Sequence, residues 1–201
     1  MKKHFSINLM IYLLTLGLVL LCSNSYSEDN INLEAISKLA QNKVKEIQNK
    51  TKQVDDLSTT SNNTVNVYAD FDCDGSYEPT IWDDATGKWS IYRYYHWPRL
   101  VVQWGLSGDI PVAANYDWDC PEEIAIWRPS TGNWHISSNN QSWPSGEVVV
   151  QWGLYGDFPI PGDYDGDGID EIAIYRPSTG KCHVSLHNQS WPNGEVVVDC
   201  D

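Results

Sequence analysis

The chain has 201 residues and a formal net charge of −14, from 27 acidic and 13 basic side chains. This balance, without a run of basic residues, excludes phosphate-rich nucleic acid as a partner and favours cations or neutral ligands. The ten tryptophans are many for this length and indicate large core positions, exposed contact surfaces, or both.

The N-terminus has the pattern of a secretory signal peptide. Lysines precede the apolar run 9–21, which is too short to span a membrane comfortably. Cleavage is predicted after Ser27, so residues 1–27 are removed and the mature chain has no membrane span. We expect a secreted, extracellular or cell-surface protein, with the periplasm as an alternative. Lipid attachment at Cys22 is a rival interpretation, but bulky leucines precede this cysteine.

Residues 28–64 are predicted to form an amphipathic helix over 30–58, followed by a polar linker. Apolar side chains recur at near-heptad spacing. They are Leu33, Ala40, Ile47 and Val54, with Ile36, Val44 and Leu57 beside them. Such a helix packs on its own domain, serves as a partly ordered spacer, or forms a short coiled-coil stalk.

Residues 65–201 contain an internal repeat with a period of 48 residues. Val-Val-Gln-Trp-Gly-Leu begins at Val101 and again at Val149, and Arg-Pro-Ser-Thr-Gly begins at Arg128 and again at Arg176. A shifted third copy comes first. Strand-forming repeats of this length are typical of propeller blades, so we predict an all-β fold of three four-stranded β-propeller blades. The blades span about 65–106, 107–154 and 155–201.

Four cysteines follow the predicted signal peptide, an even number typical of disulfide-bonded secreted proteins. Cys182 and Cys200 occupy strand positions at which both other units have tryptophans. Because the two positions change together, we predict that they are cross-strand neighbours joined by a disulfide. Cys73 and Cys120 lie in the acidic loops of adjacent units, where a disulfide and two free thiols are both compatible with the pattern.

The acidic loops have a spacing that suits calcium. This ion prefers about six to eight oxygen ligands in a flexible cage. A nine-residue loop with acids at positions 1, 3, 5 and 9 and a main-chain carbonyl at position 7 supplies them. The predicted ligands in the third unit are Asp163, Asp165, Asp167, the Ile169 carbonyl and Glu171, and those in the first are Asp70, Asp72, Asp74, the Ser76 carbonyl and Glu78.

The second loop departs from this pattern. Its candidate ligands are Asn115, Asp117, Asp119, the Pro121 carbonyl and Glu123. An amide replaces one carboxylate, and Cys120 replaces a glycine, although a Cβ atom disfavours the left-handed turn. We expect this site to be weak or lost. For all the loops, the alternative is a solvated acidic turn without an ion.

The segment Gly162-Asp-Tyr-Asp-Gly-Asp-Gly, followed by Ile172-Ala-Ile-Tyr-Arg-Pro-Ser-Thr-Gly180, resembles the FG-GAP/VCBS repeats of bacterial secreted proteins and integrin α-subunit propellers. The resemblance covers residues 65–201. It implies blades with calcium loops and an extracellular binding role, often toward sugars or proteins. The chain departs from that pattern in its number of units, its degenerate second loop and its lack of an attached enzyme domain.

Three blades are too few for a closed propeller, which typically has about four to eight. A homodimer would close a ring of six blades with two-fold symmetry, and this is the arrangement we favour. The alternatives are an open array with helix 30–58 covering one face, and a truncated gene product.

The sequence contains no nucleophile motif, zinc-ligand spacing or phosphate-binding loop, so we do not expect an enzyme. The Trp-Pro pairs at Trp97, Trp143 and Trp191 lie in the connections between third and fourth strands, beside polar residues. Exposed tryptophan suits stacking on a sugar, whereas the alternative is a ring that plugs the edge of a blade. We therefore expect a glycan-binding module. The alternative is a protein-adhesion or structural module that recognises a cell-surface protein, with calcium purely structural.

Overall fold

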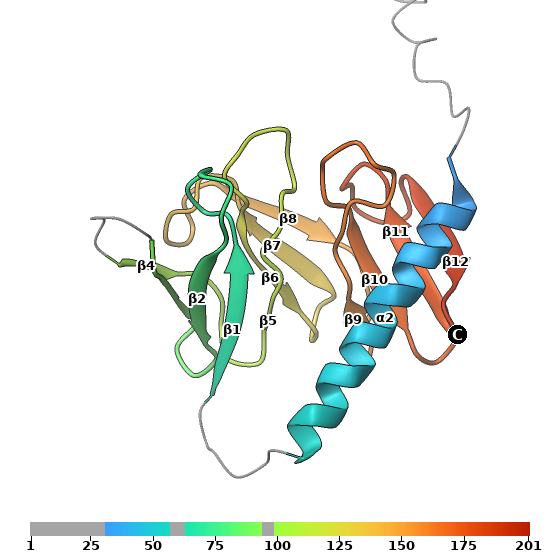
Figure 1. Ribbon diagram of the computed structural model, residues 1–201, viewed down its shortest axis with the longest axis horizontal. Coiled ribbons are helices and arrows are strands. Elements are labelled where there is room, and N and C mark those ends of the chain that lie inside the picture. Colours follow the sequence, from blue (N-terminus) through green and yellow to red (C-terminus); the bar gives the residue numbers. More distant parts are fainter. Residues whose placement is uncertain (1–30, 57–62, 94–98) are drawn as a thin grey trace, which may run out of the picture. The chain divides into compact units, whose positions relative to one another are not determined.

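The computed structural model describes residues 31–56, 63–93 and 99–201. These residues form three four-stranded antiparallel sheets and one helix near the N-terminus (Figure 1). The predicted signal peptide 1–27 and Trp97 lie outside the described residues.

The three sheets follow one another along the chain, and within each sheet the strands pair in chain order. The first sheet contains β1 (Thr64–Ala69), β2 (Glu78–Asp83), β3 (Lys88–Ile91) and β4 (Leu100–Gln103). The second contains β5 (Ile110–Pro111), β6 (Ile124–Arg128), β7 (Asn133–Ser137) and β8 (Glu147–Gln151). The third contains β9 (Phe158–Pro159), β10 (Ile172–Arg176), β11 (Lys181–Ser185) and β12 (Glu195–Asp199).

The repeat in the sequence appears as a repeat of strand register. Trp127 of β6 lies opposite Trp134 of β7, and Tyr175 of β10 lies opposite Cys182 of β11. The first strand of the third sheet, β9, is short, but its pairing with β10 continues beyond Pro159, because the Ile160 N–H donates to Ala173 O at 2.8 Å and Gly162 pairs with Glu171.

The cores lie between successive sheets. Ile124 and Ile126 of β6 belong to the buried cluster of the first sheet, and Ile172 and Ile174 of β10 belong to that of the second. One face of each of these strands packs in the core cluster of its own sheet, and the other face packs on the preceding sheet. Both faces are therefore apolar.

Helix α2 (Leu33–Asp56) packs against the third sheet (Figure 1). Its buried residues Ile36, Ala40 and Val44 share a core cluster with Tyr175 and Val184. The predicted amphipathic helix is thus present. Its sequence left three roles open, and of these the helix packs on its own domain. It covers the face of the third sheet that corresponds to the faces buried between sheets elsewhere.

All four cysteines of the described chain are paired. Cys182–Cys200 joins β11 to the residue after β12, as the paired substitution in the repeat predicts, and Cys73–Cys120 joins the loops after β1 and before β6. Two disulfides indicate an oxidising environment. Among the described residues, no helix is both long enough and apolar enough to cross a membrane.

Gly132, in the turn between β6 and β7, offers a test of how tightly successive turns pack. Its φ is +72°, and a Cβ atom there would collide with the carbonyl oxygen of Gly153, whereas Gly156 has φ +92° and open space around it. We expect Gly156→Ala to cost about 1–2 kcal/mol of unfolding free energy from left-handed strain alone. Gly132→Ala should cost about 1–3 kcal/mol more of unfolding free energy, because the backbone at Gly153 must move away. Chemical denaturation of both variants checks this, and equal losses would contradict the collision.

Candidate metal sites

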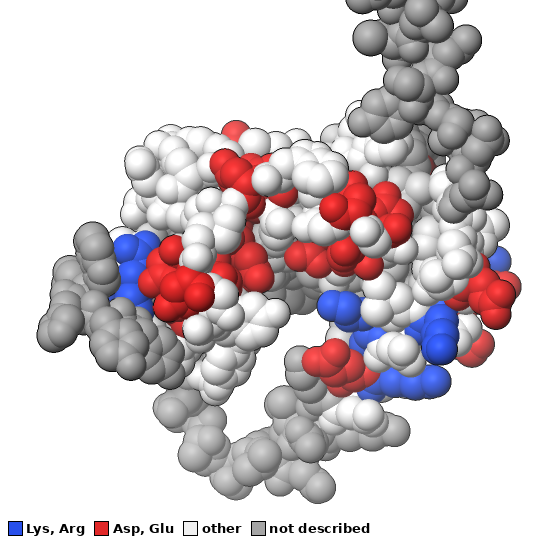
Figure 2. Space-filling view, turned by 45° about the horizontal axis from the view of Figure 1, so that its top comes forward, with Lys and Arg blue, Asp and Glu red and all other residues white. Residues whose placement is uncertain are grey.

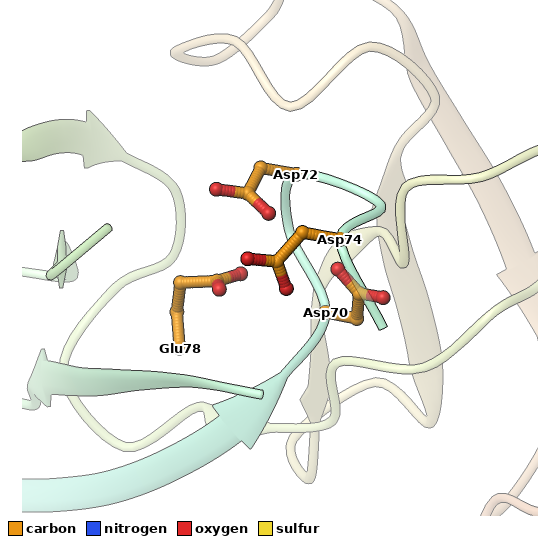
Figure 3. Close-up of side chains that lie close together, drawn as sticks. All are labelled: Asp70, Asp72, Asp74 and Glu78. Carbon is orange, nitrogen blue, oxygen red and sulfur yellow. The ribbon is translucent and has the colours of Figure 1, made fainter. Parts of the chain in front are cut away.

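The first acidic loop brings four carboxylates together. Asp70, Asp72, Asp74 and Glu78 each offer an oxygen, and these oxygens lie within 4.8 Å of one another (Figure 3). The three aspartates come from the loop after β1, and Glu78 is the first residue of β2. All the carboxylates that the sequence suggests for this loop therefore lie around one point that could hold a metal ion.

The other two loops each gather three carboxylates at the same separation. These groups are Asp117, Asp119 and Glu123 in the second loop, and Asp163, Asp165 and Glu171 in the third. Figure 2 shows acidic side chains gathered in separate patches on the face turned toward the viewer. The described residues thus contain three acidic clusters that could hold a metal ion.

Two of the predicted side-chain ligands, Asp167 and the amide Asn115, are not in these carboxylate groups. The Asp167 carboxylate accepts the N–H of Ile169 at 2.8 Å and is not a member of the third cluster. Asn115 Nδ2 donates to the Gly168 carbonyl at 2.9 Å, so this side chain connects the second loop to the third. Its Oδ1 is buried without a hydrogen-bond partner.

The first and third loops owe their shape to the aspartate at the first position. Asp70 accepts the N–H groups of Cys73 at 2.7 Å and Gly75 at 3.0 Å. Asp163 accepts those of Gly166 at 2.7 Å and Gly168 at 3.1 Å. The backbone therefore wraps around one carboxylate and turns the next ones inward, which is typical of aspartate in turns.

Cysteines replace glycines in these loops with different effects. Cys73 adopts the left-handed conformation, with φ 65°, at the position where the third loop has Gly166. Cys120 stands where the other loops have Gly75 and Gly168, yet it has no positive φ. The second loop therefore avoids the backbone strain that its sequence suggested by following a different path.

A buried glutamate ends each loop. Glu78, Glu123 and Glu171 are at most 3% exposed. One oxygen, Oε2, accepts a backbone N–H in each case, from Phe71 at 2.6 Å, Tyr116 at 2.7 Å and Tyr164 at 2.6 Å. The other oxygen of Glu78 is buried and has no hydrogen-bond partner.

The surroundings of these glutamates disfavour their charged form. Burial, reinforced by nearby aspartates, raises the pKa of Glu123 and of Glu171 to about 8, and it raises the pKa of Glu78 as well. A buried carboxylate among other acids needs either a proton or a cation. The donors are all oxygens, which suits a hard cation.

Two further acids next to the sites were missed from the sequence. Burial and the neighbouring Asp170 raise the pKa of Glu122 to about 7, and the N–H of Glu122 donates to the Asp70 carbonyl at 3.0 Å. Asp170 accepts the Asn115 N–H at 3.0 Å. Both residues therefore connect neighbouring loops. The feature of the sequence that could have identified them is the pair of acids that precedes β6 and β10 in the repeat.

Trp143 and Trp191 are exposed by 59% and 58%. Their backbone N–H groups donate across to the neighbouring sheet, to Gln103 O at 2.9 Å and Gln151 O at 3.0 Å. The main chain of each Trp-Pro connection is therefore anchored while the indole remains accessible to a ligand.

Comparison of the chain with protein-family models, curated proteins and solved structures finds no match. The interpretation of the acidic clusters and tryptophans therefore depends on their geometry and chemistry.

The raised pKa values predict that metal binding releases protons. With pKa values of about 8, Glu123 and Glu171 hold protons at neutral pH in the metal-free protein. Occupation of the third site should therefore release about one proton at pH 7, and affinity should rise with pH. Calcium titration calorimetry in buffers of different ionisation enthalpy measures this release. Buffer-independent heats would contradict it.

The same shift sets the pH dependence of the metal-free protein. A carboxyl group whose pKa is higher in the folded state than its ordinary pKa stabilises the fold at pH values below that ordinary pKa. This contribution is lost as the pH rises through the folded-state pKa of about 8. The melting temperature of the chelated protein should therefore fall as the pH is raised from about 5 to about 8. Added calcium should oppose this loss of stability.

Proposed function

We propose that this protein is a secreted or cell-surface module of FG-GAP/VCBS-like propeller blades that binds calcium in its acidic loops and recognises carbohydrate. The observation that carries the calcium assignment is the buried glutamate at the end of each carboxylate cluster, above all Glu78, whose Oε1 has no hydrogen-bond partner. A cation at that point would supply the missing partner.

Calcium fits these loops better than magnesium. Magnesium requires near-ideal octahedral geometry and gives up water reluctantly, whereas calcium accepts irregular cages of carboxylates and carbonyls. The carbonyls of Ser76 and Ile169 are the main-chain ligands we propose beside the carboxylates of the first and third loops.

Calcium would act at the junctions between sheets. The first and second loops are linked by Cys73–Cys120, and the second and third by the Asp170 N–H, which donates to Asn115 O at 2.6 Å. An ion that orders one loop therefore also stiffens its neighbour. Carbohydrate recognition is proposed for the exposed rings of Trp143 and Trp191, since tryptophan presents a flat apolar face to a sugar.

Calorimetric titration of the chelated full chain with calcium and, separately, with magnesium tests the metal assignment. We expect calcium to bind at the first and third loops with Kd of about 10⁻⁴–10⁻³ M, as in extracellular modules, and the second loop to bind more weakly. Asp163→Asn should remove one site, whereas Asp199→Asn, at an 84% exposed side chain, should not. Absence of calcium binding, or equal binding of magnesium, would refute the assignment.

A protein-adhesion role is the second candidate, and the first sheet favours it. Pro79 and Ile81 occupy the positions of the buried Ile124 and Ile126, yet Pro79 is exposed and Ile81 is only half-buried. Tyr68 of β1, which pairs with Pro79 and so lies on the same face, is also exposed, by 63%. This sheet thus offers an apolar surface to a protein partner.

Closure of six blades by a homodimer remains a proposal with a clear requirement. In such a ring the third sheet of one protomer packs on the first sheet of the other, but α2 covers that face of the third sheet. Closure therefore needs displacement of the helix, whereas an open array does not. Sedimentation velocity with calcium and after chelation distinguishes a dimer from a monomer.

A further inference from the structure

A cavity of about 210 Å³ lies between the first and second sheets. Trp104 and Ile126, both buried, contribute its apolar lining, and the exposed Trp143 borders it. Its charged lining residues are Arg128 and Glu147, with His135 beside them. We call this cavity the Trp143 pocket.

The polar residues of the Trp143 pocket form a connected chain of hydrogen bonds. Arg128 is held by the buried Asp109 through two bonds, from Nε and Nη2, each of 2.8 Å. Its Nη1 lies 3.2 Å from His135 Nε2, and His135 Nδ1 lies 2.7 Å from Glu147 Oε1. Because Arg128 can only donate, His135 Nε2 accepts, and the Nδ1–H donates to Glu147.

This arrangement leaves both donors and an acceptor for a ligand. Glu147 uses Oε1 for His135, so Oε2 is available to accept a hydroxyl proton. Arg128 has five N–H donors, of which the bonds to Asp109 and His135 use three. Asp109 holds the guanidinium plane in place, so the pocket is organised before a ligand arrives.

The charge of the pocket distinguishes among ligands. With a neutral His135, the charges of Asp109, Arg128 and Glu147 leave the group with one net negative charge. A carboxylated or phosphorylated ligand would be repelled, whereas a polyol gains hydrogen bonds to charged partners without an opposing charge.

The size and lining suggest a ring with one apolar face. The volume is below the roughly 300–1,000 Å³ of sites for drug-sized ligands, so it suits one ring rather than an oligosaccharide. Trp143, exposed by 59%, offers the apolar face on which such a ring can stack.

The network recurs at the third sheet. Asp157, Arg176, His183 and Glu195 repeat the four side chains, with 2.7 Å between His183 Nδ1 and Glu195 Oε1. The first unit instead has Asp83, Ser90 and Arg99 at the positions of the arginine, histidine and glutamate. Among the residues that the structure describes, the network therefore occurs on the two sheets that have a preceding sheet to face, as expected for a site between two sheets.

We propose that the Trp143 pocket binds a single neutral sugar ring, stacked on Trp143, with its hydroxyls accepting from Arg128 and donating to Glu147. This inference rests on the carbohydrate-binding part of the proposed function and places one binding site at this junction.

The test uses the calcium-loaded full chain and a panel of methyl glycosides. The neutral members are those of glucose, galactose, mannose, fucose and N-acetylglucosamine, and the methyl glycoside of a sialic acid is the anionic member. Ligand-observed saturation-transfer NMR measures binding. At least one neutral glycoside should bind, and the anionic one should not.

Two variants locate the site. Glu147→Gln keeps the acceptor for His135 but replaces the free carboxylate oxygen with a donor, so it should weaken binding at least tenfold. Trp143→Ala should do the same by removing the stacking face. Asp199→Asn removes a carboxylate from an exposed position of β12 and should bind like the wild type. Circular dichroism confirms that each variant is folded.

The outcomes separate the two levels of the proposal. If a neutral glycoside binds and both pocket variants retain it, carbohydrate recognition stands but the Trp143 pocket is refuted as its site. Preference for the anionic glycoside refutes the neutral-ligand assignment. If no glycoside binds while calcium still does, both the pocket and the carbohydrate function fail, and the calcium assignment remains.

Discussion

Glu171→Gln should destabilise the calcium-loaded protein and leave the chelated protein at least as stable as the wild type. Without a cation, burial holds the pKa of Glu171 at about 8, so at neutral pH the wild-type side chain is a neutral acid. A glutamine is a neutral isostere that can still accept the Tyr164 N–H. With calcium, the same substitution removes a carboxylate ligand, and the ion's contribution to stability is lost.

The size of the effect follows from mass action. For Kd of about 10⁻⁴–10⁻³ M, 10 mM calcium stabilises the folded state by about 1.4–2.7 kcal/mol per site. In a chain of this size that corresponds to a difference in Tm of roughly 3–10 °C. Thermal melts of wild type and variant, each with calcium and with chelator, measure all four values.

The matched control is Glu34→Gln, which removes one charge from the exposed first turn of α2. Its difference from wild type should be small and the same with and without calcium. If Glu171→Gln lowered Tm equally in both conditions, the glutamate would be structural and the third acidic cluster would not be a calcium site.

Trp152→Ala should cost about 3–5 kcal/mol of unfolding free energy, the usual range for removing a buried large aromatic side chain. Trp152 is fully buried in the cluster that contains Ile172 and Ile174 of the third sheet. Its indole N–H donates to His183 O at 3.0 Å. The substitution therefore opens a cavity between two sheets and also leaves a carbonyl without its partner.

Trp143→Ala is the contrasting variant, because that ring is exposed by 59% and should cost less than about 1 kcal/mol. Urea denaturation of both variants gives the two losses. Comparable losses would show that Trp143 is part of the core, and they would also rule out its use as a binding-site variant.

Much of the metal geometry is readable in the local sequence. The aspartates at the start of the first and third loops organise turns through their own backbone neighbours, so spacing alone brings Asp72 and Glu78 toward Asp70. Asp167 shows the limit. Its spacing matches that of Asp74, and both carboxylates accept the N–H two residues further on, yet only Asp74 is in a carboxylate cluster.

Contacts between units were harder to foresee. The Cys73–Cys120 pairing and the Asn115–Gly168 bond both join loops of different units, which no repeat register places side by side. The exchange of paired tryptophans for Cys182 and Cys200 was readable because those positions are cross-strand neighbours within one unit.

The strand-forming units, the turns and the composition of the acidic loops follow from the local sequence. These depend on side-chain alternation and on turn residues, which act over a few positions, and the repeat states them more than once. Tertiary structure alone decided that α2 covers the third sheet, that Asn115 connects two loops, and that Arg128, His135 and Glu147 line a cavity beside Trp143. Those outcomes depend on which apolar faces pack together. Because the hydrophobic effect is non-directional, a local sequence pattern does not specify which faces these are.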